Sequence, residues 1–218
     1  ESSAASDVYK RQDETVCNLL AAYDENPSVF TDDYNIPESG NGIEDILDEI
    51  KYELDWMLRM QENNGSCIHK VSNTCYCDAS PPSADKNFHR YLAPTLSATI
   101  SGCVTYAYGA LIYKKHKNEN MQLYGDTLEK AALNAWKYIK SNHGQIPSKA
   151  DNSGFENAAI EDNEYQQRSN VVVAASFLYA LTSNETYSKY VDSVWNSNYI
   201  HLKSWTYASI FEEHFQDA

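Results

Sequence analysis

The sequence predicts an all-α fold of about seven helices. Apolar residues recur three and four positions apart along most of the chain, and polar residues able to cap a helix precede several of these stretches. No segment alternates strongly enough to predict a strand. With 42% hydrophobic and 12% aromatic residues, 218 residues suffice for one sizeable core. Helical hairpins are therefore the expected repeating unit.

The first helix is expected to begin at Asp13 and to stop before Pro27. Its apolar residues share one face: Val16, Leu19, Leu20 and Tyr23. Residues 1–12 have no apolar period and resemble a translated cloning junction. We therefore expect residues 1–12 to be a non-native junction or a disordered tail, and residues 13–218 to be a partial domain.

A glycine-containing turn leads into the second helix, within residues 35–60. Gly40 and Gly42 allow a tight reversal of the chain. Asn41 is the expected N-cap, with Glu44 three residues later in the capping-box position. The apolar stripe of this helix follows helical spacing: Ile43, Ile46, Leu47, Ile50, Leu54, Met57 and Leu58.

The next two helices are marked by a seam of small residues and by an apolar stripe. Thr95 can cap a helix over about residues 96–115. Small residues at helical spacing would let another element approach it closely: Ala98, Gly102, Thr105 and Gly109. The stripe of the following helix ends before Gly144: Leu128, Ala131, Ala132, Ala135 and Ile139.

The last helices are expected after residue 170. Residues 171–181 are apolar almost throughout, which predicts a helix buried on nearly all sides. Asn184 can cap a further helix with four inward residues: Tyr187, Tyr190, Val191 and Val194. A final helix would contain Trp205, Ile210 and Phe211.

Four segments, in the same order, resemble motifs of the family 9 glycoside hydrolases. Residues 35–60 resemble NIPESGNG-PDILDE-KWELDW, 68–71 resemble G-V-x-H-K-V, 90–99 resemble R-Y-x-x-P-V-S-T-x-A-T, and 174–182 resemble W-A-A-A-E-L-Y-x-x-T-G. In the last segment Val173 and Phe177 stand where the family has tryptophan and glutamate. The resemblance covers roughly residues 13–210.

The resemblance implies an (α/α)6 barrel of the six-hairpin glycosidase type, of which this chain would form about half. It also implies an inverting β-1,4-glucan hydrolase of the endoglucanase type. Inversion needs an acid and a base about 6.5–9.5 Å apart. In the family the base comes from a D-A-G-D-x-x-K-Y motif and the acid is a glutamate near the end of the domain. Neither is found at its expected place, so we assign no catalytic residue and expect the 218-residue polypeptide itself to be inactive.

Three residues match substrate-contacting or neighbouring motif positions of the family. His69 matches a histidine that reaches sugar hydroxyls, and an imidazole can both donate and accept. Lys70 and Arg90 match positions of two different motifs, and the resemblance implies that His69, Lys70 and Arg90 bind substrate. From the residues alone, His69 could equally be a loop histidine bonded to nearby backbone, and the two cations could hold loops together by ion pairs.

The charge balance limits the class of partner. Thirty-one acidic residues against 17 basic ones give a formal charge of −14, which disfavours nucleic acid and anionic membranes. A neutral β-glucan carries no such penalty, and no apolar run reaches the length of a membrane span. An extracellular location is expected from the family's substrate. The alternatives are a non-catalytic glucan-binding protein, a different α-barrel carbohydrate enzyme and a helical-hairpin interaction protein.

No cofactor is required by this chemistry, but two metal sites can be considered. Cys67, His69, Cys75 and Cys77 could bind zinc, although the usual Cys-x2-Cys spacing is missing, and a disulfide in this loop is the favoured interpretation. An oxygen-rich loop could hold a structural calcium ion or simply be solvated: Glu156, Glu161, Asp162 and Glu164.

Overall fold

The computed structural model describes residues 6–75, 84, 86–142, 152–155 and 162–195. Within these residues lie six α-helices: α1 (Tyr9–Glu25), α2 (Asp45–Arg59), α3 (Leu96–Tyr113), α4 (Glu119–Asn142), α5 (Glu164–Thr182) and α6 (Glu185–Trp195). A short 3-10 helix, η1, spans Pro27–Val29. The short strands are β1 (Ser6–Val8), β2 (Cys67–Ile68), β3 (Lys70–Asn73), β4 (His89–Tyr91) and β5 (Pro94–Thr95).

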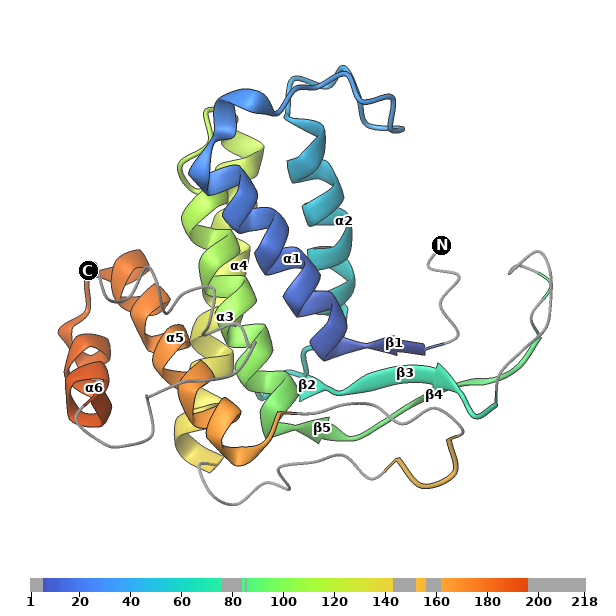
Figure 1. Ribbon diagram of the computed structural model, residues 1–218, viewed down its shortest axis with the longest axis vertical. Coiled ribbons are helices and arrows are strands. Elements are labelled where there is room, and N and C mark those ends of the chain that lie inside the picture. Colours follow the sequence, from blue (N-terminus) through green and yellow to red (C-terminus); the bar gives the residue numbers. More distant parts are fainter. Residues whose placement is uncertain (1–5, 76–83, 85, 143–151, 156–161, 196–218) are drawn as a thin grey trace.

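The helices pair into three antiparallel hairpins (Figure 1). Helix α1 packs against α2, α3 against α4, and α5 against α6. The first helices of the three hairpins also pack on one another, with α3 between α1 and α5. The predicted hairpin unit is confirmed, and α3 is the central element of the described fold. None of the described helices is long and apolar enough to cross a membrane.

Helix α3 is buried on all sides, Leu111 excepted. The Thr95 side chain accepts from the Ala98 N–H at 3.1 Å, so the predicted cap is confirmed. A Cβ built on Gly109 would lie 3.1 Å from Leu128 of α4 and 3.4 Å from Leu54 of α2. Side chains of two neighbouring helices therefore meet at this end of the predicted small-residue seam, where a larger residue would have little room.

The apolar stripe of α2 is buried or half-buried as expected, but the start of the helix was wrongly predicted. The N-cap is Glu44, which makes no side-chain cap hydrogen bond, and Asn41 does not cap the helix. Instead, the Asn41 amide accepts from the Ile43 N–H at 2.8 Å and donates to Asp48 at 2.9 Å. Gly42 has φ +86° and Glu44 is extended, so the chain turns helical three residues later than predicted.

Strands appear where the sequence predicted none. One sheet has the order β1-β3-β4 and the other pairs β2 with β5, all antiparallel. The longest strand has four residues, too few to reveal an alternation in the sequence. Helix α1 also begins at Tyr9, four residues before the expected Asp13. The assignment of residues 1–12 as a non-native junction stays a prediction.

The last hairpin is partly as expected. Residues 171–175 of α5 are buried, but Tyr179 and Ala180 are exposed, so this helix is not covered on all sides to its end. The side-chain oxygen of Asn184 accepts from the Thr186 N–H at 3.0 Å and caps α6, and Tyr187 is buried against Trp136 of α4. The helix expected around Trp205, Ile210 and Phe211 lies outside the described residues.

Candidate functional site

The first helices of the three hairpins all begin at the same end of the molecule, beside strands β2 to β5 (Figure 1). Thr95 caps α3 at this end. Asn163 and Gln166 form a capping box at the start of α5, with both hydrogen bonds at 2.9 Å. Their N-termini therefore bring the positive ends of the helix dipoles together at one face.

Buried polar side chains are concentrated at this end. Buried polar groups need hydrogen-bond partners and are costly to keep, so such a concentration is typical of a functional site. The set includes Asp13, Ser66, His69, Lys70, Ser72, Asn73, Ser97, Asp162 and Asn170.

His69 joins β2 to β3 and has no exposed surface. The Cys67 N–H donates to the Thr99 hydroxyl at 3.0 Å, and that hydroxyl donates to the Thr95 carbonyl at 2.7 Å. The segment that carries His69 is therefore fixed to the first turn of α3.

Lys70 is also fully buried. Its ammonium lies 5.0 Å from the centre of the Phe155 ring, and its carbonyl accepts from the Leu92 N–H at 2.9 Å. A buried ammonium is costly unless its charge is compensated, and an aromatic face supplies part of that compensation. Lys70 therefore connects β3 to residues 152–155.

Arg90 lies on β4 and is exposed. It faces Ser72 across the antiparallel pair of β3 and β4. His69 and Lys70 are consecutive and interior, whereas Arg90 is at the surface and pairs with Ser72, two residues after Lys70. Their contact with substrate stays a prediction.

Asp162 and Asn170 belong to the same end but were not singled out as a pair. The Asp162 carboxylate accepts from the Asn170 amide at 2.9 Å, and the Gln167 amide donates to the Asp162 carbonyl at 2.8 Å. Both residues are buried. In the sequence, the only sign of this pair is that Asp162 and Asn170 lie eight residues apart, on either side of the capping residue Asn163.

The expected metal and disulfide sites find little support in the described residues. Cys67 and Cys75 form no disulfide, which corrects the expected disulfide for these two, and Cys77 lies outside the described residues. Glu156 and Glu161 also lie outside them, and Glu164 pairs with Arg168 at 2.6 Å. Within the described part of the chain, no three acidic, histidine or cysteine side chains converge on a possible metal position. The calcium site stays a prediction.

One segment reproduces the spacing of the aspartate motif D-x-x-D-x-x-K-Y with Asp45, Asp48, Lys51 and Tyr52. It lies at the start of α2, at the opposite end of the molecule from β2 to β5 (Figure 1). The buried Asp45 carboxylate accepts from the Tyr34 N–H at 2.6 Å and the Ser39 hydroxyl at 2.7 Å. This aspartate therefore organises the turn before α2 and is remote from the candidate site.

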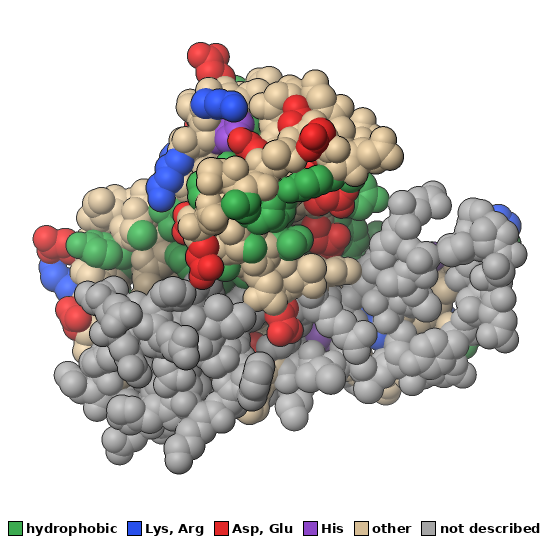
Figure 2. All heavy atoms as spheres, turned by 45° about the horizontal axis from the view of Figure 1, so that its top comes forward, with side chains coloured by type: hydrophobic (Ala, Val, Ile, Leu, Met, Phe, Trp, Pro, Cys, Tyr) green, Lys and Arg blue, Asp and Glu red, His purple; other side chains and the backbone are tan. Residues whose placement is uncertain are grey.

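The molecular surface agrees with the charge balance of the sequence. On the face in Figure 2, acidic side chains lie in several groups around a hydrophobic strip. Such a surface repels anionic polymers and leaves a neutral ligand unaffected.

Comparison with known proteins places these features in context. The family model described as Glycosyl hydrolase family 9 matches residues 11–214. A cellodextrinase of Butyrivibrio fibrisolvens is 28% identical over 173 residues, covering 78% of this chain and 28% of the relative. Endoglucanase D of Acetivibrio thermocellus is 32% identical over 133 residues, covering 58% of this chain and 20% of the relative.

Solved structures agree in fold. A metagenome-derived family 9 endoglucanase superposes with a TM-score of 0.78 at 24% identity, covering 88% of this chain and 34% of that one. A family 9 protein of Bacteroides ovatus gives 0.76 at 21% identity, covering 86% and 35%. The fold is thus that of the (α/α)6 barrel, as predicted. The chain spans less than a third of the length of the curated relatives named above.

Proposed function

This chain belongs to glycosyl hydrolase family 9, and from that premise we propose that the whole protein hydrolyses β-1,4-glucosidic bonds in cellulose or a related glucan. The observation that carries this proposal is the match over residues 11–214, which includes all four motif segments. Relatives named as endoglucanase and cellodextrinase support the same substrate class. The substrate is polymeric, so an extracellular location belongs to the proposal.

This chain supplies barrel scaffold and one part of the substrate cleft. The scaffold is the buried helix α3 with its two neighbours, α1 and α5. The cleft part is the end where these three helices begin. A neutral glucan suits this end because buried hydroxyl, amide and imidazole groups can exchange hydrogen bonds with sugar hydroxyls without a charge penalty.

His69, Lys70 and Arg90 are the proposed substrate-binding residues. Arg90 is exposed and can donate to a sugar directly. His69 and Lys70 have no exposed surface, so their role requires the substrate to displace the segments that cover them, such as Phe155 over Lys70. Arg90 is accordingly the first of the three to test.

Inverting hydrolysis needs a carboxylic acid and a carboxylate base about 6.5–9.5 Å apart. The sequence has neither the family's base motif nor its acid at the expected places, and Asp45 and Asp48 lie at the start of α2, at the opposite end of the molecule from the candidate site. We therefore propose that the 218-residue polypeptide alone does not hydrolyse glucan. The acid and the base would come from outside the matched segments.

The test compares this polypeptide with a longer open reading frame recovered from the same source. Hydrolysis of carboxymethyl cellulose is measured as released reducing ends, and NMR follows the anomer formed first. We expect turnover with inversion for the longer protein and none for the 218-residue polypeptide. A longer frame that lacks an Asp-x-x-Asp motif before Asp13, or that shows no turnover, would refute the proposal.

A further inference from the structure

The two most exposed large hydrophobic side chains of the described residues lie three positions apart, at Phe88 and Tyr91. Their exposed fractions are 89% and 68%, and the next highest value is 64%, at Leu123 on α4. Keeping a large aromatic ring in water forgoes the stabilisation that its burial would give. Two such rings on one short segment are the kind of surface that marks a binding site.

Strand β4 holds this segment at the edge of a sheet. Among the strands of the described residues, in the order β1-β3-β4, it pairs only with β3, and Tyr91 faces Val71. Alternate residues of a strand share a face, so His89 and Tyr91 lie on one face and Arg90 on the other. The residue after Tyr91 donates its backbone N–H to the Lys70 carbonyl at 2.9 Å. The exposed Tyr91 ring is therefore one residue away from a backbone hydrogen bond to the buried Lys70 of the candidate site.

The chemistry of residues 88–91 suits a neutral sugar chain. A glucose unit presents an apolar C–H face, which can stack on a ring, and a rim of hydroxyl groups. Tyr91 offers the ring, His89 can both donate and accept, and Arg90 donates. A polyanion could also pair with the Arg90 guanidinium, but the net charge of −14 on the chain repels polyanions.

We propose that residues 88–91 form an outer glucan-binding segment, the β4 platform. A glucosyl unit stacks on the Tyr91 ring, and its hydroxyls bond to His89, which lies on the same face of β4. The platform continues the cleft outward from His69 and favours long chains over short ones. This inference rests on the proposed function, because it takes the ligand class from it.

Affinity electrophoresis of the 218-residue chain in native gels containing hydroxyethyl cellulose tests the platform. The polymer should retard the unsubstituted chain. Tyr91→Ala should weaken this binding about fivefold, as expected for the loss of one stacking contact. Tyr91→Phe keeps the ring and should bind nearly as well. Tyr52→Ala is the matched control, because Tyr52 is 58% exposed but lies on α2.

Three outcomes overturn the platform: no retardation of the unsubstituted chain, unchanged retardation of Tyr91→Ala, or equal losses for Tyr91→Ala and Tyr52→Ala. Circular dichroism of each variant confirms that the helices persist. If Tyr91→Ala instead changes only the oligomeric state, the edge strand pairs copies of the chain and the platform is wrong. Turnover by the longer protein without Tyr91-dependent retardation refutes the platform alone. Tyr91-dependent retardation without turnover refutes the proposed hydrolase alone.

Discussion

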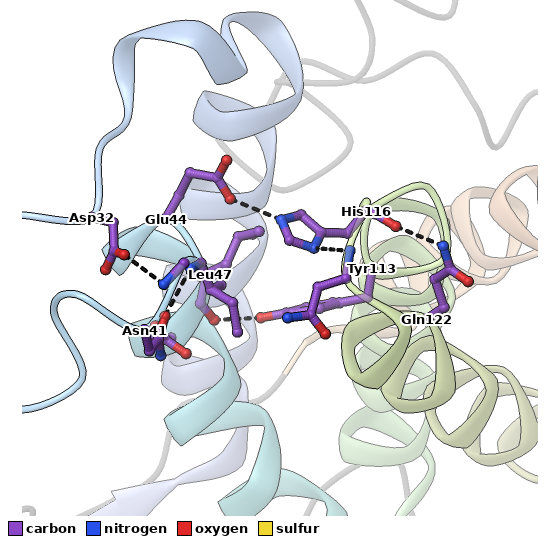
Figure 3. A network of polar contacts seen from close by, with 11 residues as sticks. Asp32, Asn41, Glu44, Leu47, Tyr113, His116 and Gln122 are labelled. Atoms are coloured by element: carbon purple, nitrogen blue, oxygen red, sulfur yellow. Dashed lines mark hydrogen bonds and ion pairs between the residues drawn. The ribbon is translucent and has the colours of Figure 1, made fainter.

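His116 Nε2 lies 2.9 Å from the Glu44 carboxylate and joins the connection between α3 and α4 to the residue before α2 (Figure 3). The other ring nitrogen, Nδ1, accepts from the Asn118 N–H at 3.1 Å, so Nε2 carries the proton and donates to Glu44. The Gln122 amide also donates to the His116 carbonyl at 2.8 Å. One histidine therefore connects two hairpins at the end remote from the candidate site.

His116→Ala should lower the free energy of unfolding by about 1–3 kcal/mol, because it leaves a half-buried carboxylate and a backbone N–H without their partner. Chemical denaturation measures this loss. His89→Ala, at an exposed position on β4, is the control and should change stability by less than about 0.5 kcal/mol. Equal effects of the two substitutions would show that the contact between His116 and Glu44 is energetically unimportant.

Asp32 should make stability depend on acidity. The Gly42 N–H, and then the Gly40 N–H, lower the pKa of the Asp32 carboxyl below 3.8 and outweigh the opposing effect of burial. Both N–H groups donate at 2.6 Å. A group whose pKa is lowered by folding stabilises the fold above its unfolded pKa, and this stabilisation is lost as the pH falls through the folded value.

Asp32→Asn should therefore be less stable than the unsubstituted chain at pH 7, and the difference should shrink as the pH falls below 3.8. Denaturation curves from pH 7 to about pH 2.5 give the comparison. Asp192→Asn, at an exposed position on α6, is the matched control for the removal of one carboxylate charge. A difference that stayed constant over this range would rule out the carboxylate charge as its source.

Tyr113 provides a buried contact between α3 and α2. Its hydroxyl donates to the Leu47 carbonyl at 2.6 Å, and its side chain has no exposed surface. Burial raises the pKa of Tyr113 well above 10.0, so the hydroxyl keeps its proton over the working pH range. Tyr113→Phe should cost about 0.5–1.5 kcal/mol at every pH between 5 and about 9, measured by denaturation. Tyr52→Phe, on the exposed side of α2, should cost almost nothing.

Local chemistry explains which features the sequence could predict. Thr95 is predictable as a cap because a hydroxyl just before a helix can accept a hydrogen bond from a backbone N–H of the first turn, and the structure confirms this bond. Asn41 has the same chemistry, but the positive φ of Gly42 and the extended Glu44 moved the helix start out of its reach. Capping residues alone therefore locate a helix to within a few residues.

Long-range pairings had no signal in the sequence. Glu44 and His116 are 72 residues apart, and neither position is unusual for its own segment. Strand β3 pairs with β1, which precedes it in the chain, and with β4, which follows it. Its four residues are too few to show the alternation of a strand. The family motifs did place His69, Lys70 and Arg90 on one end of the fold, but their burial depends on residues such as Phe155 that no motif names.

Gly65 should be irreplaceable because of a contact with α4. It has φ +94°, and a Cβ at this position would lie 2.2 Å from the Asn134 carbonyl oxygen. Gly65→Ala should therefore destabilise the chain by more than about 2 kcal/mol, combining backbone strain with a clash against backbone atoms.

Gly40→Ala separates these two effects. Gly40 has a similar φ, +88°, but a Cβ there would meet nothing within 4 Å. It should cost only the conformational strain, about 1 kcal/mol. If thermal and chemical denaturation gave the same loss of unfolding free energy for Gly65→Ala and Gly40→Ala, the close approach of Asn134 to Gly65 would not contribute to the cost of the substitution.

The buried contact between Lys70 and Phe155 should contribute more to stability than a similar exposed contact. The ammonium is buried at 5.0 Å from the ring centre, whereas Lys140 is exposed and lies 4.3 Å from the Tyr190 ring. Removal of water strengthens a cation–π contact more than a small change in distance weakens it. A double-mutant cycle with Lys70→Met and Phe155→Leu should give a coupling of about 2 kcal/mol, against about 0.5 kcal/mol for Lys140→Met and Tyr190→Leu. A coupling near zero for Lys70 and Phe155 would show that this contact does not hold residues 152–155 against β3, and Phe155 would then be free to leave the candidate site without an energetic cost from this contact.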